Sequence, residues 1–261
     1  MRTCLAARVA VPLAPLAADL AAEGDDLDAL VAPLPPAAWS APTPADGWSV
    51  GDSVVHLQLS DEAGLTALRG EDLAEIGAAL LTPAYDGDPA ALLVRWRCSR
   101  VAVPAAVLAL PEGARVPWFG PSMGAASFLT ARLMETWAHG QDVADALGVR
   151  RVPTERLRAV ADLGVRTRGW SHALAGVPLP DVAVRVSLVS PGGATWTWGP
   201  ADAAESISGI ALDFCLLVTQ RRHADDLGLQ VNGDAARAWV AVAQAFAGDR
   251  GTGRLAGLPP A

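Results

Sequence analysis

The spacing of the apolar residues changes near residues 178–180, and this change limits the folds that the sequence can adopt. Before that point, apolar side chains recur every three to four residues, the period of an amphipathic helix. After it, Val184, Val186 and Leu188 alternate with other side chains, as in a half-buried strand. The sequence therefore predicts a mainly α protein with a smaller α/β part, divided into domains at residues 1–175 and 176–261.

Five segments of the first part have helical spacing. A helix over residues 16–31 should end at the proline-rich stretch PLPP. A second should begin near Val50, because Ser49 is a good N-cap and Asp52 is placed to complete a capping box. Further helices are expected at residues 89–108, at residues 122–147 before Gly148, and over PTERLRAVADLGVRTRGW.

The second part should begin with a β-hairpin. Its strands are expected in DVAVRVSLV and ATWTWG, joined by the turn sequence PGG. A helix at residues 203–220, a short strand in LGLQVNG and a helix at residues 234–247 should follow. The Gly-rich tail from residue 248 is expected to be mobile.

Charge and composition narrow the classes of partner. The net charge is −8 and no Lys/Arg-rich run occurs, so nucleic acid is not an expected partner. No apolar run reaches the roughly 20 residues that a membrane-spanning helix requires, so no membrane partner is expected. The apolar start of the chain is interrupted by Pro12 and Pro15, which argues against a signal peptide.

The three cysteines do not suggest a disulfide framework. Cys4, Cys98 and Cys215 are odd in number, widely spaced and without a CxxC pair, so a reducing cytoplasm is the expected location. Cys98 and Cys215 lie among apolar residues and are expected in the core.

Glu135 and His139 are the most informative polar pair. Residues four apart on a helix share one face, so these two side chains could bind one metal ion. His56, in the apolar run SVVHLQL, could supply a third ligand from another helix. From the pattern alone, however, His56 could equally be a hydrogen-bonded core residue, and the Glu135/His139 pair a surface contact.

Two longer segments resemble a known family. TPADGWSVGDSVVHL and the later ARLMETWAHGQDVADALG resemble the DinB-like metal-binding superfamily, specifically its mycothiol-dependent maleylpyruvate isomerase branch. The residues that match the motifs of that branch are Trp48, Ser49, Val50, Asp52, His56, Leu57, Glu135, His139 and Asp142. VSLVSPGGATWTWGP and ISGIALDFCLLVTQRR also resemble its C-terminal domain. The resemblance implies an N-terminal DinB-like four-helix bundle followed by a sterol-carrier-like α/β domain.

The resemblance also implies a metal site. His56, Glu135 and His139 would bind a divalent ion, for which zinc is the first choice and nickel, cobalt and iron are alternatives. Asp142, one turn beyond His139, would either orient an imidazole or be a solvated helix residue. Trp48 and Trp137 flank the ligand segments and could form an aromatic wall or pack in the core.

In the resembled branch, the ion activates the thiol of mycothiol, which adds to a conjugated double bond. The implied function is thus isomerisation or S-transfer on a small acidic metabolite, with mycothiol as a possible cofactor. Arg221 and Arg222 are candidates for binding the acidic substrate, although cations at such positions also stabilise helix C-termini.

Two other functions stay open. One is a thiol-independent metal-dependent lyase, hydratase or cyclase. The other is a non-enzymatic protein that binds a metal or an apolar ligand. No catalytic residue is assigned beyond the candidates Asp142, Arg221 and Arg222, and the sequence leaves the substrate and the oligomeric state undetermined.

Overall fold

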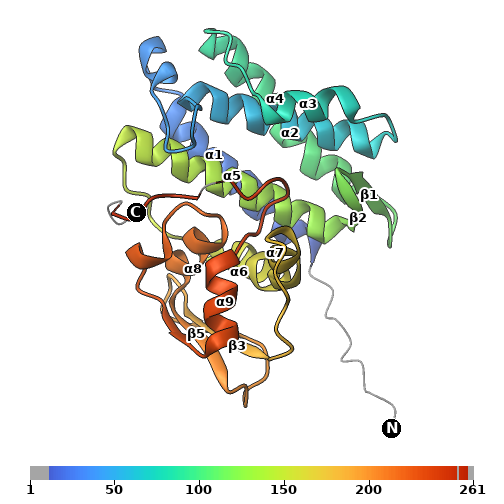
Figure 1. Ribbon diagram of the computed structural model, residues 1–261. Helices are drawn as coiled ribbons and strands as arrows, with labels where there is room; N and C mark the ends of the chain where they lie inside the picture. Colours follow the sequence, from blue (N-terminus) through green and yellow to red (C-terminus); the bar gives the residue numbers. More distant parts are fainter. Residues whose placement is uncertain (1–11, 252, 258–261) are drawn as a thin grey trace.

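The computed structural model describes residues 12–251 and 253–257. Cys4 and most of the N-terminal stretch weighed as a signal peptide lie outside the described residues. The order of elements agrees with the expected fold class, because long helices come first and a small mixed sheet follows (Figure 1). In the described part of the chain, no helix combines the length and the apolar character needed to cross a bilayer.

Four long helices form the upper part of the molecule in Figure 1: α1 (Leu13–Val31), α2 (Val50–Leu68), α4 (Pro89–Leu108) and α5 (Ala125–Leu147). Helix α2 packs against α4 and α5, and α1 packs against the same two helices. Leu27, Val54, Trp96 and Val143 are buried in the core that these helices enclose. Helices α2 and α5 thus lie side by side, which brings their polar residues together.

Four short elements connect these helices and were not expected from the sequence. They are the 3₁₀ helix η1 (Pro36–Ser40), helix α3 (Ala74–Leu81), and the antiparallel pair β1 (Arg115–Trp118) and β2 (Gly120–Gly124). Consequently α5 begins at Ala125, after β2, rather than at residue 122. The 3₁₀ helix and the two strands are too short for a hydrophobic pattern to reveal them.

Helices α6 (Leu157–Arg166) and α7 (Arg168–Leu174) lead into a four-stranded sheet of order β4-β3-β5-β6. The strands are β3 (Val184–Val189), β4 (Thr195–Trp198), β5 (Glu205–Ile210) and β6 (Gln230–Asn232). The expected hairpin is confirmed, since β3 pairs antiparallel with β4, while β3 and β5 are parallel. Helices α8 (Ala211–Val218) and α9 (Asp234–Val242) and the 3₁₀ helix η2 (Ala224–Asp226) complete this part.

The expected helix over residues 203–220 is wrong in its first half. Residues from Glu205 to Ile210 form β5, which pairs along its whole length with β3, and only α8 is helical. Ile207 is buried in the sheet, so pairing with β3 overrides the helical spacing of this segment. Two other expectations need smaller corrections, since PTERLRAVADLGVRTRGW forms two helices that meet at Thr167, and α9 ends at Val242 rather than at residue 247.

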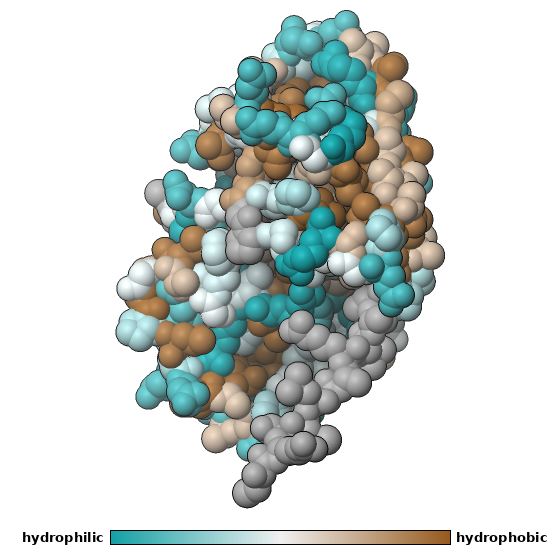
Figure 2. Space-filling view, turned by 90° about the vertical axis from the view of Figure 1, so that its right-hand side faces the viewer, coloured by the Kyte–Doolittle hydropathy of each residue, from teal (hydrophilic) through white to brown (hydrophobic). Residues whose placement is uncertain are grey.

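The cysteines differ in exposure. Cys215 is buried, as expected, but Cys98 is exposed, so its predicted core position is wrong. Cys98 lies on the face of α4 that also exposes Val94 and Val101, one turn to either side. Figure 2 shows hydrophobic and hydrophilic side chains interleaved on the face of the molecule that lies on the right-hand side of Figure 1.

One cluster of buried side chains includes residues from both parts of the chain. Leu133 and Met134 of α5, Leu157 of α6, Phe214 of α8 and Trp239 of α9 all belong to it. The domain boundary at residues 175 and 176 stays a prediction.

Candidate metal centre

The first turn of α2 is fixed by a capping box. The backbone N–H of Asp52 donates to Ser49 Oγ at 3.1 Å, and the backbone N–H of Ser49 donates to Asp52 Oδ2 at 2.8 Å. Asp52 Oδ1 also accepts a hydrogen bond from the Tyr85 backbone N–H at 2.8 Å. The Ser and Asp of the first motif therefore determine where α2 begins, and His56 follows one turn after Asp52.

The side chains of His56, Glu135 and His139 meet between α2 and α5. Glu135 Oε2 lies 3.9 Å from His56 Nε2 and 3.6 Å from His139 Nε2. One donor atom from each residue lies within 4.8 Å of the others. The structure thus brings together the three residues that the sequence selected as metal ligands.

The groups that face the Nδ1 atoms suit both histidines to ligation through Nε2. His56 Nδ1 lies 3.0 Å from the Leu80 carbonyl oxygen, an arrangement in which Nδ1 donates and Nε2 keeps its lone pair. Among the described residues, the buried Nδ1 of His139 has no hydrogen-bond partner, and Asp142 Oδ2 lies 3.5 Å away. A carboxylate at this position can orient an imidazole whose other nitrogen binds a metal.

The charge states of the cluster also suit a divalent cation. Burial lowers the pKa of His56, which favours the neutral imidazole that a metal requires. Burial alone would raise the pKa of Glu135, but hydrogen bonds and charge interactions with His139 and His56 outweigh it and lower that pKa. A neutral imidazole and an ionised carboxylate are therefore both available, so the residues present fit a divalent ion.

Asp142 is completely buried and contacts two arginines. Its Oδ2 accepts a hydrogen bond from Arg221 Nη2 at 2.8 Å, and its Oδ1 accepts one from Arg254 Nη2 at 2.6 Å. Burial would raise the pKa of Asp142, but Arg221, His139 and Arg254 together lower it. Asp142 is therefore an ionised residue beside His139, and the alternative of a solvated helix residue is wrong.

The two arginines selected from the sequence both pair with carboxylates of α5. Arg221 pairs with Asp142, and Arg222 donates two hydrogen bonds to Asp145 at 2.7 and 2.8 Å. Each arginine also donates to a carbonyl after the end of α8, Arg221 to that of Thr219 and Arg222 to that of Arg221.

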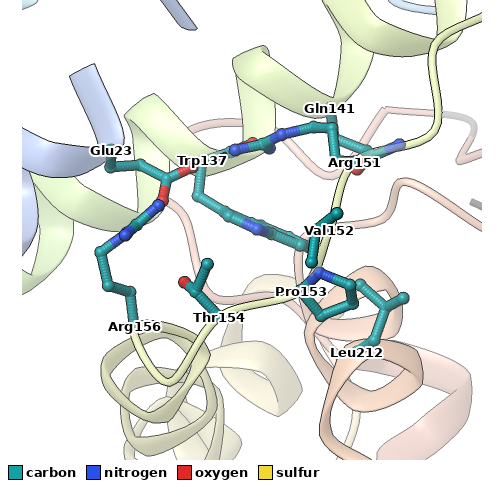
Figure 3. Close-up of a pocket in the computed structure, with 9 residues that line it drawn as sticks. All are labelled: Glu23, Trp137, Gln141, Arg151, Val152, Pro153, Thr154, Arg156 and Leu212. Atoms are coloured by element: carbon teal, nitrogen blue, oxygen red, sulfur yellow. Dashed lines mark hydrogen bonds and ion pairs between the residues drawn. The ribbon is translucent and has the colours of Figure 1, made fainter. Parts of the chain in front are cut away.

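Trp48 covers the imidazole pair. Its ring centroid lies 5.4 Å from that of His139, with an interplanar angle of 14°, and 5.0 Å from that of His56. The predicted aromatic wall is therefore present on the Trp48 side. Trp137 instead lines a separate, small cavity (Figure 3).

This small cavity lies within an ion-pair network between α1 and the segment after α5. Glu23 is 1% exposed and accepts hydrogen bonds from Arg151 and Arg156 (Figure 3). Arg151 also donates to the Trp137 carbonyl at 3.0 Å. The cavity volume is only about 10 Å³, room for about one water molecule, so the cavity is too small for a substrate. The ion-pair network around it therefore stabilises the fold.

Two groups near the centre were missed from the sequence. The Leu80 carbonyl comes from α3, an element that was not predicted. Arg254 comes from the tail that was expected to be mobile, yet it hydrogen-bonds to Asp142 and to the Pro44 carbonyl. In Figure 1 the segment after α9 runs back along α5. The apolar run LAEIGAALL could have revealed α3, but nothing in the Gly-rich tail singles out Arg254.

The helical layer and the His/Glu cluster between α2 and α5 agree with the DinB-like fold and metal site that the sequence motifs implied. A family model described as "Mycothiol maleylpyruvate isomerase N-terminal domain" matches residues 20–144, and one described as "Wyosine base formation" matches residues 185–229. Two uncharacterized proteins of Mycobacterium tuberculosis, from strains CDC 1551 and H37Rv, are each 49% identical over 252 residues, covering 92% of this chain and 98% of theirs.

Solved structures share the fold. Crystal structures of a mycothiol-dependent maleylpyruvate isomerase and of its histidine-to-alanine mutant match with TM-scores of 0.57 and 0.60, at 17% and 16% identity. Each match covers 84% of this chain and 93% of the solved chain. The chain belongs to the mycothiol-dependent maleylpyruvate isomerase branch of the DinB-like superfamily.

Proposed function

We propose that the chain is a divalent-metal-dependent enzyme that uses a low-molecular-weight thiol, mycothiol, in isomerisation or S-transfer on a small acidic metabolite. His56, Glu135 and His139 would hold the ion, with zinc preferred and nickel, cobalt or iron as alternatives. The observation that supports this most is the convergence of the three donor atoms within 4.8 Å of one another.

Three protein ligands leave positions for a water molecule or a substrate atom, as in catalytic rather than structural zinc sites. A bound divalent ion would lower the pKa of a thiol, so that the thiolate is available near neutral pH. A free thiol needs a reducing compartment, which favours the cytoplasm as the location of this enzyme.

The side chains around the ligands would keep the site in one geometry. The Leu80 carbonyl fixes the His56 ring, and the Asp142 carboxylate orients His139. Trp48 lies over both imidazoles and would limit the access of water from its side. These residues position the ligands, and none of them has to react.

Arg221 and Arg222 are assigned here to positioning rather than to substrate binding. Each donates hydrogen bonds to an α5 carboxylate, Asp142 or Asp145, and an acidic substrate would have to displace that carboxylate. Through Asp142, Arg221 would hold the orientation of His139.

A thiol titration of the cobalt-substituted protein tests the proposal. Mycothiol should bind saturably and produce a sulfur-to-cobalt charge-transfer band in the near ultraviolet. A mycothiol analogue with a hydroxyl in place of the thiol should leave this region unchanged, and the variant His56→Ala should show no cobalt spectrum.

Other results would point to the alternatives. A cobalt spectrum that is unaffected by mycothiol would favour the thiol-independent lyase, hydratase or cyclase. A protein that binds no divalent metal would overturn both enzyme proposals and favour a protein that only binds an apolar ligand.

A further inference from the structure

A separate cavity of about 190 Å³ lies between α8, α9 and the C-terminal segment. Leu217 and Val240 form part of its apolar wall, and Arg222, His223, Arg250 and Arg254 contribute basic groups. None of the three proposed metal ligands lines it. The cavity can hold several water molecules or a small organic acid.

The charge of the lining is positive. Among the described residues that line the cavity there is no Asp or Glu. Arg222 pairs with Asp145 of α5, and Arg254 shares Asp142 of α5 with Arg221. Arg250 donates to the Ala241 carbonyl and forms no ion pair with the residues that the structure describes. One guanidinium charge at the cavity is therefore left for a ligand.

His223 supplies a second polar group. Its Nδ1 accepts a hydrogen bond from the Asp225 backbone N–H at 3.2 Å, and the Asp225 carboxylate lies 3.5 Å from the same nitrogen. A neutral imidazole that accepts at Nδ1 carries its proton on Nε2. The Nε2–H can thus donate to an oxygen atom of a ligand.

The wall of the cavity includes a residue in an uncommon backbone conformation. Gln220 has φ 57°, and it is the only residue other than glycine with positive φ in the described part of the chain. Its side-chain Nε2 donates to the Ala243 carbonyl at 3.2 Å and to Gln244 Oε1 at 3.4 Å, which joins the turn after α8 to the end of α9. Residues held in such conformations often belong to functional sites.

We propose that this cavity binds a small organic anion. An oxyanion, carboxylate or phosphate, would be bound by Arg250 and His223, and the apolar body of the ligand would pack against Leu217 and Val240. The inference goes beyond the proposed function, because it requires no metal. Arg254 lines the cavity and also contacts Asp142, so the two sites share one residue.

Calorimetric titration of the full-length protein tests this proposal with three probes: benzoate, its uncharged analogue benzamide, and inorganic phosphate. At least one of the two anions should bind with a stoichiometry of one, and more weakly at high salt, while benzamide should not bind. Tighter binding of benzoate would identify a carboxylate ligand, and tighter binding of phosphate a phosphorylated one.

Matched variants locate the binding. Arg250→Gln and His223→Asn should each weaken binding about tenfold, the loss expected for a hydrogen bond to a charged group. His223→Asn keeps a side-chain acceptor for the Asp225 N–H. The control Arg237→Gln removes an arginine of α9 that is paired with Asp234 and does not line the cavity, so binding should be unchanged.

The variant His56→Ala separates this proposal from the proposed function. It should bind the anion with the affinity of the parent protein even though its metal site is lost. The proposal is overturned if neither anion binds at millimolar concentration, if benzamide binds as tightly as benzoate, or if Arg250→Gln binds like the parent. Thermal unfolding of each variant will show that the fold is retained.

Discussion

A buried ion pair joins the two helices that carry the proposed metal ligands, and its removal gives a quantitative prediction. Arg132 of α5 donates to Asp61 Oδ1 of α2 from Nη2 at 2.9 Å and from Nε at 3.2 Å. Their side chains are only 3% and 7% exposed. Asp61 follows His56 on α2, and Arg132 precedes Glu135 on α5, so this pair fixes how the two ligand segments lie against each other.

The substitution Asp61→Ala would leave the Arg132 guanidinium buried, with only its 3.3 Å hydrogen bond to the Leu57 carbonyl. Breaking a buried pair from one side costs about 3–5 kcal/mol, because the remaining charge has no counterion. For a chain of roughly this size, each kcal/mol lowers Tm by about 2–4 °C, so we expect Tm to fall by about 6–20 °C. Denaturant unfolding and calorimetry of the same samples measure both quantities.

Two further variants separate charge burial from simple loss of packing. Asp61→Leu combined with Arg132→Met removes both charges and should recover most of the lost stability. Ser99→Ala leaves the ion pair in place and removes two hydrogen bonds of the Ser99 hydroxyl, one to Asp61 at 3.4 Å and one to the Trp96 carbonyl at 3.1 Å. It should cost about 1–2 kcal/mol, less than Asp61→Ala. The reasoning is refuted if Asp61→Ala changes the free energy of unfolding by less than about 1 kcal/mol, or if the double variant is less stable than either single variant.

Three other predictions concern packing, the C-terminal segment and the thiols. Gly164→Ala should destabilise the protein by about 1–3 kcal/mol, because the added Cβ would lie 2.7 Å from Val218 Cγ2, and Val218→Ala should relieve this in denaturant unfolding. Arg254→Gln should weaken metal binding about tenfold in chelator competition, because it removes the hydrogen bond from the C-terminal segment to Asp142 of α5. An unchanged affinity would contradict this role of Arg254. In a background without the N-terminal cysteine, a thiol reagent should modify Cys98 at once and Cys215 only on unfolding, because Cys215 is buried and burial raises the pKa of its thiol. Rapid reaction of both cysteines would contradict this prediction, because it would show that the reagent reaches Cys215 of α8 in the folded protein.

The long helices could be predicted because they repeat one pattern over many turns. The predicted helix over residues 89–108 coincides with α4, and the predicted capping box at Ser49 gave the first residue of α2. Residues from Glu205 to Ile210 were misassigned because their strand conformation depends on parallel pairing with β3, which is separated from them in sequence by β4. The local spacing of apolar residues does not show which strand a segment will pair with.

The residues of the candidate site were likewise predicted only in part. His56, Glu135 and His139 were selected because helical spacing and a family motif both involve them, and the structure places their donor atoms together. The Leu80 carbonyl and Arg254 were missed, since each reaches the site through tertiary structure and belongs to no motif. Backbone carbonyls in particular carry no residue-type signature.

The central claim is that His56, Glu135 and His139 bind one divalent ion, and metal analysis of purified protein tests it most directly. The parent protein should contain about one equivalent of zinc or a similar ion, the stoichiometry of a three-ligand site. His56→Ala and Glu135→Ala should both lose it. The control Glu62→Ala, at an exposed position of α2, should retain it. A parent protein that stays metal-free after supplementation, or variants that keep a full equivalent, would contradict the account.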